Sequence, residues 1–304
     1  MSGKPFLRFM MFFGLCLCAS MIVYIGPTEV LTKISNAHLP NILIAVFFYL
    51  LIVLLGLIRW YAFLLLSKTP VAYKKIANIY MLNTFVSNLT PARSGDAMVP
   101  KMLSEAADVP TSKSTAMLIV DRASDLLTLA TLFVAASIWL VMQTSIQLPA
   151  NVSMFAIPTI ILIAVGSGFM VFRSKVKILA PVQTFLIETQ FELKHYLSAA
   201  KLVLVVALSI ANWSLHFLKE FFLFSAFLQI SLIQLAVCQS ISNVFILLSF
   251  IPGGVGVNVV TNSVLVQQMG LDWQAAATSG LVGTVLFTSI RFLLSLVFNR
   301  HLLR

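Results

Sequence analysis

The segment LSFIPGGVGVN, residues 248–258, interrupts a long apolar part of the chain. A proline and three glycines fall within residues 252–256, and apolar sequence continues on both sides. Because proline removes a backbone donor and glycine loosens the backbone, we expect a membrane helix to break here. A break at bilayer depth leaves backbone polar groups without partners, which is tolerated only where that backbone is buried in protein or lines a wet cavity. The function of this helix break depends on the class of protein in which it occurs.

Composition predicts an all-α, polytopic helical membrane protein. Hydrophobic residues make up 60% of the 304 residues and charged residues 10%, against about 45–50% and about 25% in soluble domains. The runs 42–57 and 126–142 carry no charge at all. We expect residues 1–304 to form a single membrane domain. The net charge of +10 indicates loops that face the cytoplasm, not a nucleic-acid partner.

Hydrophobic run lengths predict about six full spans and one interfacial helix. The helix at residues 175–200 mixes apolar residues with lysine and glutamate, as a helix at the membrane surface does. Two further apolar regions, 76–103 and 233–269, are interrupted by proline and glycine and do not fit as simple spans. The predicted spans are residues 6–25, 41–60, 114–142, 151–172, 202–228 and 275–298.

Loop charges predict that both termini are cytoplasmic, in the cytoplasmic membrane of the cell. The loop at 143–150 has no charge, and the loop at 26–40 has Lys33 against Glu29. Both are therefore expected outside. The cytoplasmic loops and ends carry Lys4, Arg8, Lys68, Lys74, Lys75, Lys101, Lys113, Arg173, Lys175, Lys177, Lys194, Lys201, Arg300 and Arg304.

The two interrupted regions match each other. NTFVSNLTPARSGDAMVPKML at 83–103 and NVFILLSFIPGGVGVNVVTNSVL at 243–265 place Pro91 on Pro252 and Gly95 on Gly256, both 161 residues apart. The predicted orientation reverses between them, which indicates an inverted repeat with elements at about 76–142 and 233–299. This pattern is typical of transporters with a site near the bilayer midplane, between the repeats.

We therefore interpret the two breaks as the tips of two re-entrant helical hairpins that enter from opposite faces. Freed amide groups and helix N-termini at the tips could hold an anionic group, such as a lipid phosphate. The alternative is that proline and glycine only kink ordinary spans, because both are commoner in membrane helices than in soluble ones.

Several motifs carry a resemblance to a known family. The pieces NLTPARSGD, VDRASDLLTL, FIPGGVGV and RFLL, with RW at 59–60, resemble the membrane domain of lysylphosphatidylglycerol synthases. They are equally similar to the free-standing, flippase-like membrane proteins grouped with that domain. The resemblance covers nearly the whole chain in order and implies translocation of a lipid, aminoacylated phosphatidylglycerol in one branch.

The chain departs from the family pattern at two places. Asn258 and Val259 stand where the family often has an acidic residue after the second motif. Met98, Val99 and Pro100 stand where an arginine commonly follows the first glycine–acid pair. These departures put the usual substrate of the family in question. The 304 residues contain no soluble aminoacyl-transferring domain, so we expect no aminoacyl-lipid synthesis by that route.

Polar residues in the apolar segments are the candidates for substrate binding, because charges in a membrane are costly and usually face a cavity. We expect Arg93 to contact a headgroup, with Asp96 setting its charge or orientation; an Arg–Asp pair that closes a turn is the alternative. The candidates are Asn83, Asn88, Pro91, Arg93, Ser94, Gly95, Asp96, Asp121, Arg122, Asp125, His216, Lys219, Glu220, Pro252, Gly253, Gly254, Gly256, Asn258, Asn262 and Arg291.

Three of these groups have open alternatives. The spacing of Asp121, Arg122 and Asp125 lets them share one helix face, for a substrate or for a structural ion pair. His216, Lys219 and Glu220 form a polar cavity wall or proton-coupling group, or else Lys219 snorkels from a shifted span. Arg291 is expected to face the interior, with Asp125 or Glu220 as its partner.

The resulting hypothesis is a translocator of an anionic lipid or lipid-linked intermediate, with no cofactor, no bound metal and no enzymatic activity. Homo-oligomers remain open. One alternative is a membrane-embedded transferase, which normally needs acidic residues in a water-accessible loop; this chain has ten acidic residues in all. The other alternative is a small-solute or ion transporter with similar hairpins.

Overall fold

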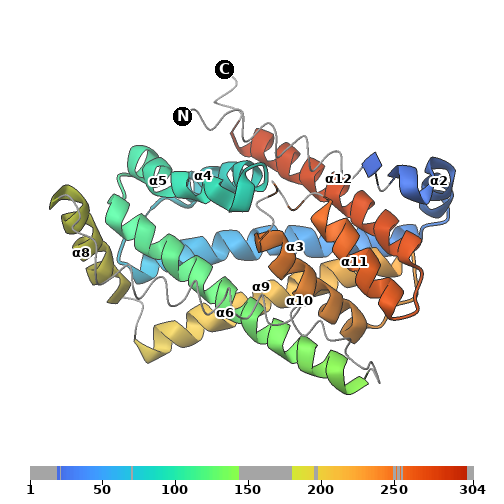
Figure 1. Ribbon diagram of the computed structural model, residues 1–304. Helices are drawn as coiled ribbons and strands as arrows, with labels where there is room; N and C mark the ends of the chain where they lie inside the picture. The colour runs from blue at the N-terminus through green and yellow to red at the C-terminus, as the bar shows by residue number, and fades with distance from the viewer. Residues whose placement is uncertain are drawn as a thin grey trace.

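The computed structural model describes residues 19–20, 22–69, 71–143, 180–194, 198–248, 251, 254 and 256–299. These residues form helices joined by turns, with no strand among them (Figure 1). The helices are α2 (Pro27–Ser35), α3 (Leu39–Leu66), α4 (Tyr73–Asn88), the 3₁₀ helix η1 (Pro91–Met98), α5 (Val99–Ala107), α6 (Thr111–Gln143), α8 (Ala180–Lys194), α9 (Ala199–Ser225), α10 (Leu232–Leu248), α11 (Val257–Gln268) and α12 (Trp273–Phe298).

Three described helices are long and apolar enough to cross a membrane: α3, α9 and α12. At 1.5 Å per residue, the 28 residues of α3 reach about 42 Å, beyond a bilayer core of about 30 Å. They are candidate membrane spans by length and composition, and they lie where spans are predicted, at 41–60, 202–228 and 275–298. α3 and α9 lie antiparallel along each other, and the His38 amide donates to the Ala226 carbonyl where they meet at one end (Figure 1).

The helix predicted at 114–142 is found as α6, a helix of 33 residues that crosses the long helices diagonally in Figure 1. All of its charged residues lie in its first half. The predicted span 151–172 lies outside the described residues. Of the predicted span 6–25, only 19–20 and 22–25 are described, and they are helical. The predicted surface helix 175–200 corresponds to α8.

The first interrupted region folds as a short helix pair, α4 and α5, joined by η1. Thr90 takes an extended conformation because the residue before a proline is driven out of the helical region, so α4 ends just before Pro91. A Cβ on Gly95 would lie 3.0 Å from the Ser87 backbone. A side chain at residue 95 would therefore crowd the Ser87 backbone and push η1 away from α4. A 3₁₀ segment of eight residues is unusually long and often marks a functional or strained site.

The second interrupted region also folds as a helix pair, with α11 packed against α10. The helix break predicted from residues 248–258 is confirmed, because α10 ends at Leu248 and α11 begins at Val257. Gly254 and Gly256 have φ of 62° and 83°, a conformation that glycine adopts without strain. Pro252 and Gly253 lie outside the described residues.

The two helix pairs contact the long helices in a crossed pattern. α5 packs against α6 and α11 against α12, the long helix that follows each pair. The other member of each pair crosses over, so that α4 packs against α12 and α10 against α6. The apolar contacts of α10 with α6 join Val237 and Ile241 to Leu129 and Phe133. Each long helix is thus held by one helix from each pair.

Candidate functional site

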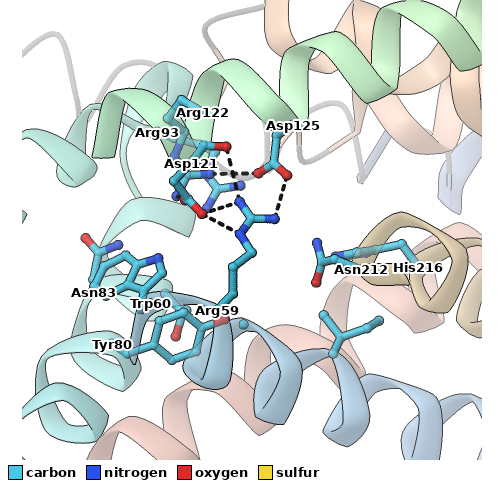
Figure 2. Close-up of a pocket in the computed structure, with 13 residues that line it drawn as sticks. Arg59, Trp60, Tyr80, Asn83, Arg93, Asp121, Arg122, Asp125, Asn212 and His216 are labelled. Atoms are coloured by element: carbon cyan, nitrogen blue, oxygen red, sulfur yellow. Dashed lines mark hydrogen bonds and ion pairs between the residues drawn. The ribbon is translucent and has the colours of Figure 1, made fainter. Parts of the chain in front are cut away.

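A cavity of about 90 Å³ lies between α3, α4, η1, α6 and α9. Roughly 10–15 Å³ is enough for one water molecule, so the cavity has room for several. Figure 2 shows its side chains converging from these elements, with Arg59 rising from α3 toward α6. We call it the charged cavity. It is lined by Ile52, Gly56, Arg59, Trp60, Tyr80, Asn83, Thr84, Arg93, Asp121, Arg122, Asp125, Asn212 and His216.

Arg59 lies at the centre of this arrangement and is 3% exposed. Its Nε donates to Asp121 Oδ1 at 2.5 Å, its Nη1 to Asp125 Oδ1 at 2.8 Å, and its Nη2 to the Asp121 carbonyl at 3.1 Å. The planar fork of arginine suits two carboxylates at once, which a lysine cannot match. Asp121 and Asp125 share one helix face, as their spacing predicts, and Arg59 binds both.

Asp96 is the second centre of charge, and η1 brings it against α4 and α6. Its Oδ1 accepts from Asn83 at 2.9 Å and from the Ser87 hydroxyl at 2.6 Å. Its Oδ2 lies 3.0 Å from Nε of Arg122 and 3.6 Å from Nε of Arg93. Asp96 therefore joins the helix break to α6 and pairs more closely with Arg122 than with Arg93.

Arg93 differs from the other two arginines. Its side chain is 56% exposed, and its single ion pair among the described residues is the long one to Asp96. Its backbone has φ of 57°, a left-handed conformation that a non-glycine side chain adopts only at a cost. Such strain persists only where the surrounding structure imposes it, and it concentrates at functional sites. Arg93 is thus a strained and weakly paired cation at the edge of the cavity.

Three arginines and three aspartates form a charge-balanced set that we call the arginine–aspartate cluster: Arg59, Arg93, Arg122, Asp96, Asp121 and Asp125. Charges buried in a low-dielectric interior need partners, because an unpaired one is strongly destabilising. The cluster meets this need and ties α3, η1 and α6 together. An anion that enters would compete with an aspartate for an arginine.

Two walls complete the cavity. On one side Trp60 meets Tyr80 edge to face, with ring centroids 5.0 Å apart, and the Tyr80 hydroxyl lies over Gly56, where no Cβ would fit. On the other side α9 presents Asn212 and His216, which face Arg59 across the cavity (Figure 2). The cavity therefore combines aromatic, amide, imidazole and charged groups.

Of the predicted residues, the structure gathers Asn83, Arg93, Asp121, Arg122, Asp125 and His216 around the charged cavity, with Asp96 directly behind. Ser94 is exposed beside them and Gly95 is buried against α4, and Pro91 begins η1. Gly254 and Gly256 lie in the second break. Asn258 and Asn262 lie on α11 and do not line the charged cavity. The Asn262 side-chain amide donates a hydrogen bond to Asn258 Oδ1, and its oxygen accepts one from the Ser242 hydroxyl.

The prediction that Arg291 pairs with Asp125 or Glu220 is wrong. Its Nε donates to the Tyr49 hydroxyl at 3.0 Å, and its Nη1 donates to the Asn88 side chain. Asp125 is already held by Arg59 and Arg122. Arg291 therefore joins α12 to α3 and α4 through neutral groups.

Lys219 and Glu220 lie apart from the arginine–aspartate cluster and pair with each other, Nζ to Oε1 at 2.5 Å. Lys219 is buried, and its Nζ lies 4.5 Å from the Phe287 ring centroid on α12. A cation over an aromatic face is stabilised by the ring quadrupole. This geometry contradicts the snorkelling alternative for Lys219.

Sequence reasoning missed Arg59, Trp60 and Tyr80 as site residues. Arg59 and Trp60 form the RW pair that supported the family resemblance, but no spacing rule links them to residues about sixty positions away. An arginine inside an apolar span is itself a signal, because such a charge usually faces a polar interior. Tyr80 carries no signal of this kind.

The fold and the site define the class of this protein: an integral membrane protein of helices, with two broken helix pairs and a charged cavity beside one break. The chain belongs to the family described as the lysylphosphatidylglycerol synthase TM region, whose model matches residues 11–298. It is similar to the UPF0104 membrane protein PH1989 of Pyrococcus horikoshii, with 25% identity over 299 residues, covering 85% of this chain and 86% of that relative. No solved structure matches the chain.

Proposed function

We propose that this protein moves an anionic phospholipid or lipid-linked intermediate between the leaflets of the membrane and returns it chemically unchanged. The observation that carries the proposal is Arg93, a half-exposed, weakly paired guanidinium at the edge of the charged cavity and at a helix break. Arginine binds phosphate through two parallel hydrogen bonds, which makes it the natural contact for a phospholipid headgroup. The family description names lysylphosphatidylglycerol, a lipid whose headgroup contains a phosphate, and this supports a phospholipid as the substrate class.

The pairing distances support a role for Arg93 rather than for its neighbours. Arg59 is fully engaged with Asp121 and Asp125 in the interior. Arg122 contacts three carboxylates at 3.0–3.5 Å. A headgroup at Arg93 displaces only one ion pair of 3.6 Å, so it binds without unpairing a buried charge.

We propose further that the two helix pairs are re-entrant hairpins of an inverted repeat, at about 76–142 and 233–299, that gives alternating access to the site. The 16 residues of α4 and the 17 of α10 reach only about 24–26 Å. Both fall short of a core of about 30 Å. The crossed packing on α6 and α12 supports a symmetric origin. Residues 248–268 contain no charged residue and carry the amides of Asn258 and Asn262 instead, so the headgroup is expected at the first break.

The distribution of basic residues supports the proposed orientation, with both termini in the cytoplasm. At the C-terminal end of α3, Lys113 and Lys201 donate to the carbonyls of Ser67 and Leu66. At the other end, Lys33 is balanced by acidic partners. An excess of positive charge marks the cytoplasmic end of a membrane protein.

The test is leaflet-resolved quenching of fluorescent phosphatidylglycerol in proteoliposomes. We expect Arg93→Ala to abolish flipping, and Arg93→Lys to retain part of it, because lysine keeps the charge without the bidentate fork. Lys101→Ala is the matched control, since Lys101 is an exposed cation on the neighbouring α5; it is expected to flip at the wild-type rate.

Each other outcome has a defined meaning. Normal flipping by Arg93→Ala removes Arg93 from the site. A wild-type protein that flips none of several anionic lipids favours the small-solute alternative. Mass spectrometry of the recovered lipid separates the transferase alternative, because a transferase alters the lipid and a translocator does not.

A further inference from the structure

A second, larger hollow lies between α6 and α9. Its volume is about 410 Å³, against about 90 Å³ for the charged cavity. We call it the α6–α9 groove, and its apolar walls are Leu127 and Leu132 on α6 and Val206, Ile210 and Phe217 on α9. Leu127 and Ile210 are 62% and 53% exposed, so the groove is open at its edge.

The polar side chains in the groove are almost all satisfied within their own helices. Thr128, Thr131 and Ser214 each donate to the carbonyl four residues earlier. The exception is Trp213, whose Nε1 is buried and has no hydrogen-bond partner among the described residues. An indole N–H can only donate, and buried donors are nearly always paired. The groove therefore offers an apolar surface with one unused donor.

The groove and the charged cavity adjoin each other. Trp213 of the groove contacts His216 of the cavity, with ring centroids 5.5 Å apart. The two hollows use consecutive segments of α6, residues 121–125 and 127–132, and the same segment of α9, residues 206–217. The buried hydrogen bond from Ser209 to Ser124, at 2.9 Å, joins the two helices there. A molecule at this junction meets charge on one side and apolar side chains on the other.

We infer that the α6–α9 groove holds one acyl chain of the glycerophospholipid whose headgroup occupies the charged cavity, and that Trp213 donates to the ester carbonyl at the root of the chain. This inference rests on the proposed function. The charged cavity is too small for more than a compact polar group, whereas apolar pockets for large ligands span roughly 300–1,000 Å³. The unused donor at the junction is matched by the acceptor that a phospholipid carries between headgroup and chain.

The test uses the full chain in proteoliposomes with phosphatidylglycerol that carries a photoactivatable diazirine in one acyl chain. We expect adducts on peptides that cover residues 127–132 and 206–217. Ile210→Trp fills the groove and is expected to lower both the adduct yield there and the flipping rate at least about fivefold. Val203→Trp is the matched control, because Val203 is exposed on α9 but does not line the groove; both readouts are expected to stay at wild-type values.

Trp213→Phe tests the donor while keeping an aromatic ring. The loss of one hydrogen bond predicts an increase of about fivefold in the lipid fraction needed for half-maximal flipping. Gel filtration and melting temperature check that each variant is folded, and Leu127→Trp on the opposite wall is the second blocking variant. If the folded blocking variants label and flip like the wild type, the groove is not an acyl-chain site.

The remaining outcomes separate the two proposals. A wild type that labels in the groove but flips no lipid refutes translocation and leaves the acyl-chain site standing. A wild type that flips lipid without labelling in the groove refutes the acyl-chain site alone. A disulfide that forms readily between a cysteine at position 210 and one within residues 151–172 would show that this segment of the chain occupies the groove in place of an acyl chain. That result would overturn the inference.

Discussion

Arg59 is the residue on which the arginine–aspartate cluster depends. We expect Arg59→Met to lower the free energy of unfolding by about 3–5 kcal/mol, because it leaves Asp121 and Asp125 without their central partner in the interior. Arg59→Lys keeps the charge but not the fork, so an intermediate loss is expected. Thermal unfolding of the detergent-solubilised protein measures both.

The control for Arg59 is a pair of similar chemistry on the surface. Lys101→Ala breaks an exposed pair with Glu105 at 3.7 Å, and the expected cost is below about 0.5 kcal/mol. The double variant Arg59→Met, Asp121→Asn removes both charges and is expected to recover part of the stability. A double variant no more stable than Arg59→Met would show that lost packing, not an unpaired carboxylate, explains the loss.

The left-handed backbone of Arg93 allows strain and function to be separated. Arg93→Gly and Arg93→Ala both remove the guanidinium, so both are expected to lose flipping. Glycine adopts φ of 57° freely and alanine does not. We therefore expect the glycine variant to be the more stable of the two by about 1 kcal/mol in thermal unfolding. Equal stability would mean that this backbone relaxes when the side chain is shortened.

Sequence reasoning at this scale succeeds within a helix and fails between helices. The spacing of Asp121 and Asp125 predicts a shared face, and both bind Arg59. Which cation would face them is not encoded by any spacing, since Arg59 lies on α3. For Arg291, the expectation of a carboxylate overlooked neutral partners, and Tyr49 and Asn88 satisfy its guanidinium instead.

At the scale of elements, Lys33 joins α2 to the beginning of α12 through Asp272, at 2.7 Å. Burial lowers the pKa of Lys33, but the hydrogen bond and charge of Asp272 outweigh it, so the pKa is raised. Burial raises the pKa of Asp272. The hydrogen bond from Lys33 and the hydrogen bonds from the helix amides that Asp272 caps have a larger, opposite effect, so the pKa of Asp272 is lowered. The ion pair between Lys33 and Asp272 therefore stabilises the fold only at pH values between the lowered pKa of Asp272 and the raised pKa of Lys33.

This contact predicts a pH dependence with two limbs. The stabilisation from Asp272 is present above the ordinary pKa of an aspartate and is lost as pH falls through the lowered value. The stabilisation from Lys33 is present below the ordinary pKa of a lysine and is lost as pH rises through the raised value. Asp272→Asn keeps a helix cap but removes the charge. The wild type is expected to be more stable at neutral pH by at most about 1 kcal/mol, because both groups are partly exposed.

Melting temperatures of the wild type and Asp272→Asn from acid to alkaline pH check this prediction. Their difference should be flat around neutrality and should shrink at both extremes. A constant difference at every pH would assign the effect of Asp272 to capping alone.

Element boundaries show what the chain reveals by itself. The breaks at Pro91 and at residues 252–256 follow from local backbone chemistry, and both are found. The start of α12 was predicted at Ala275 from hydropathy, but the helix begins at Trp273 because Asp272 accepts from the amides of Gln274 and Ala275. The crossed packing of α4 on α12 and of α10 on α6 depends on contacts between distant segments, which hydropathy does not report.

At the scale of the whole molecule, the two ends of the long helices differ in charge. Lys113 and Lys201 gather at the C-terminal carbonyls of α3, where a cation is also favoured by the helix dipole. The opposite end of α3 lies near α2 and the end of α9, and its charges are balanced. The charged cavity lies between these ends. Among the described residues, a lipid beside this molecule would therefore meet unbalanced basic side chains at the C-terminal end of α3 and a charge-balanced group at the other end.

The final prediction concerns how the two helix pairs enter the membrane. A re-entrant pair has both ends on one side, and an inverted repeat places the two pairs on opposite sides. We expect cysteines at Lys75 and Ala106, which lie near the outer ends of α4 and α5, to be protected from an impermeant maleimide in intact cells. Cysteines at Ser231 and Gln268, which bracket α10 and α11, should react. All four positions are exposed, so a lack of labelling reports sidedness rather than burial.

The background for this experiment lacks the three native cysteines, and permeabilised cells, in which all four positions should react, provide the control. Labelling of all four positions in intact cells, or of none, would place both helix pairs on one face and refute the inverted repeat. If only one end of a pair reacts, that pair crosses the membrane and is not re-entrant. A full reversal, with Lys75 and Ala106 labelled and the other two protected, would keep the repeat but overturn the cytoplasmic termini. The basic end of α3 would then face outward, against the usual charge bias of membrane proteins.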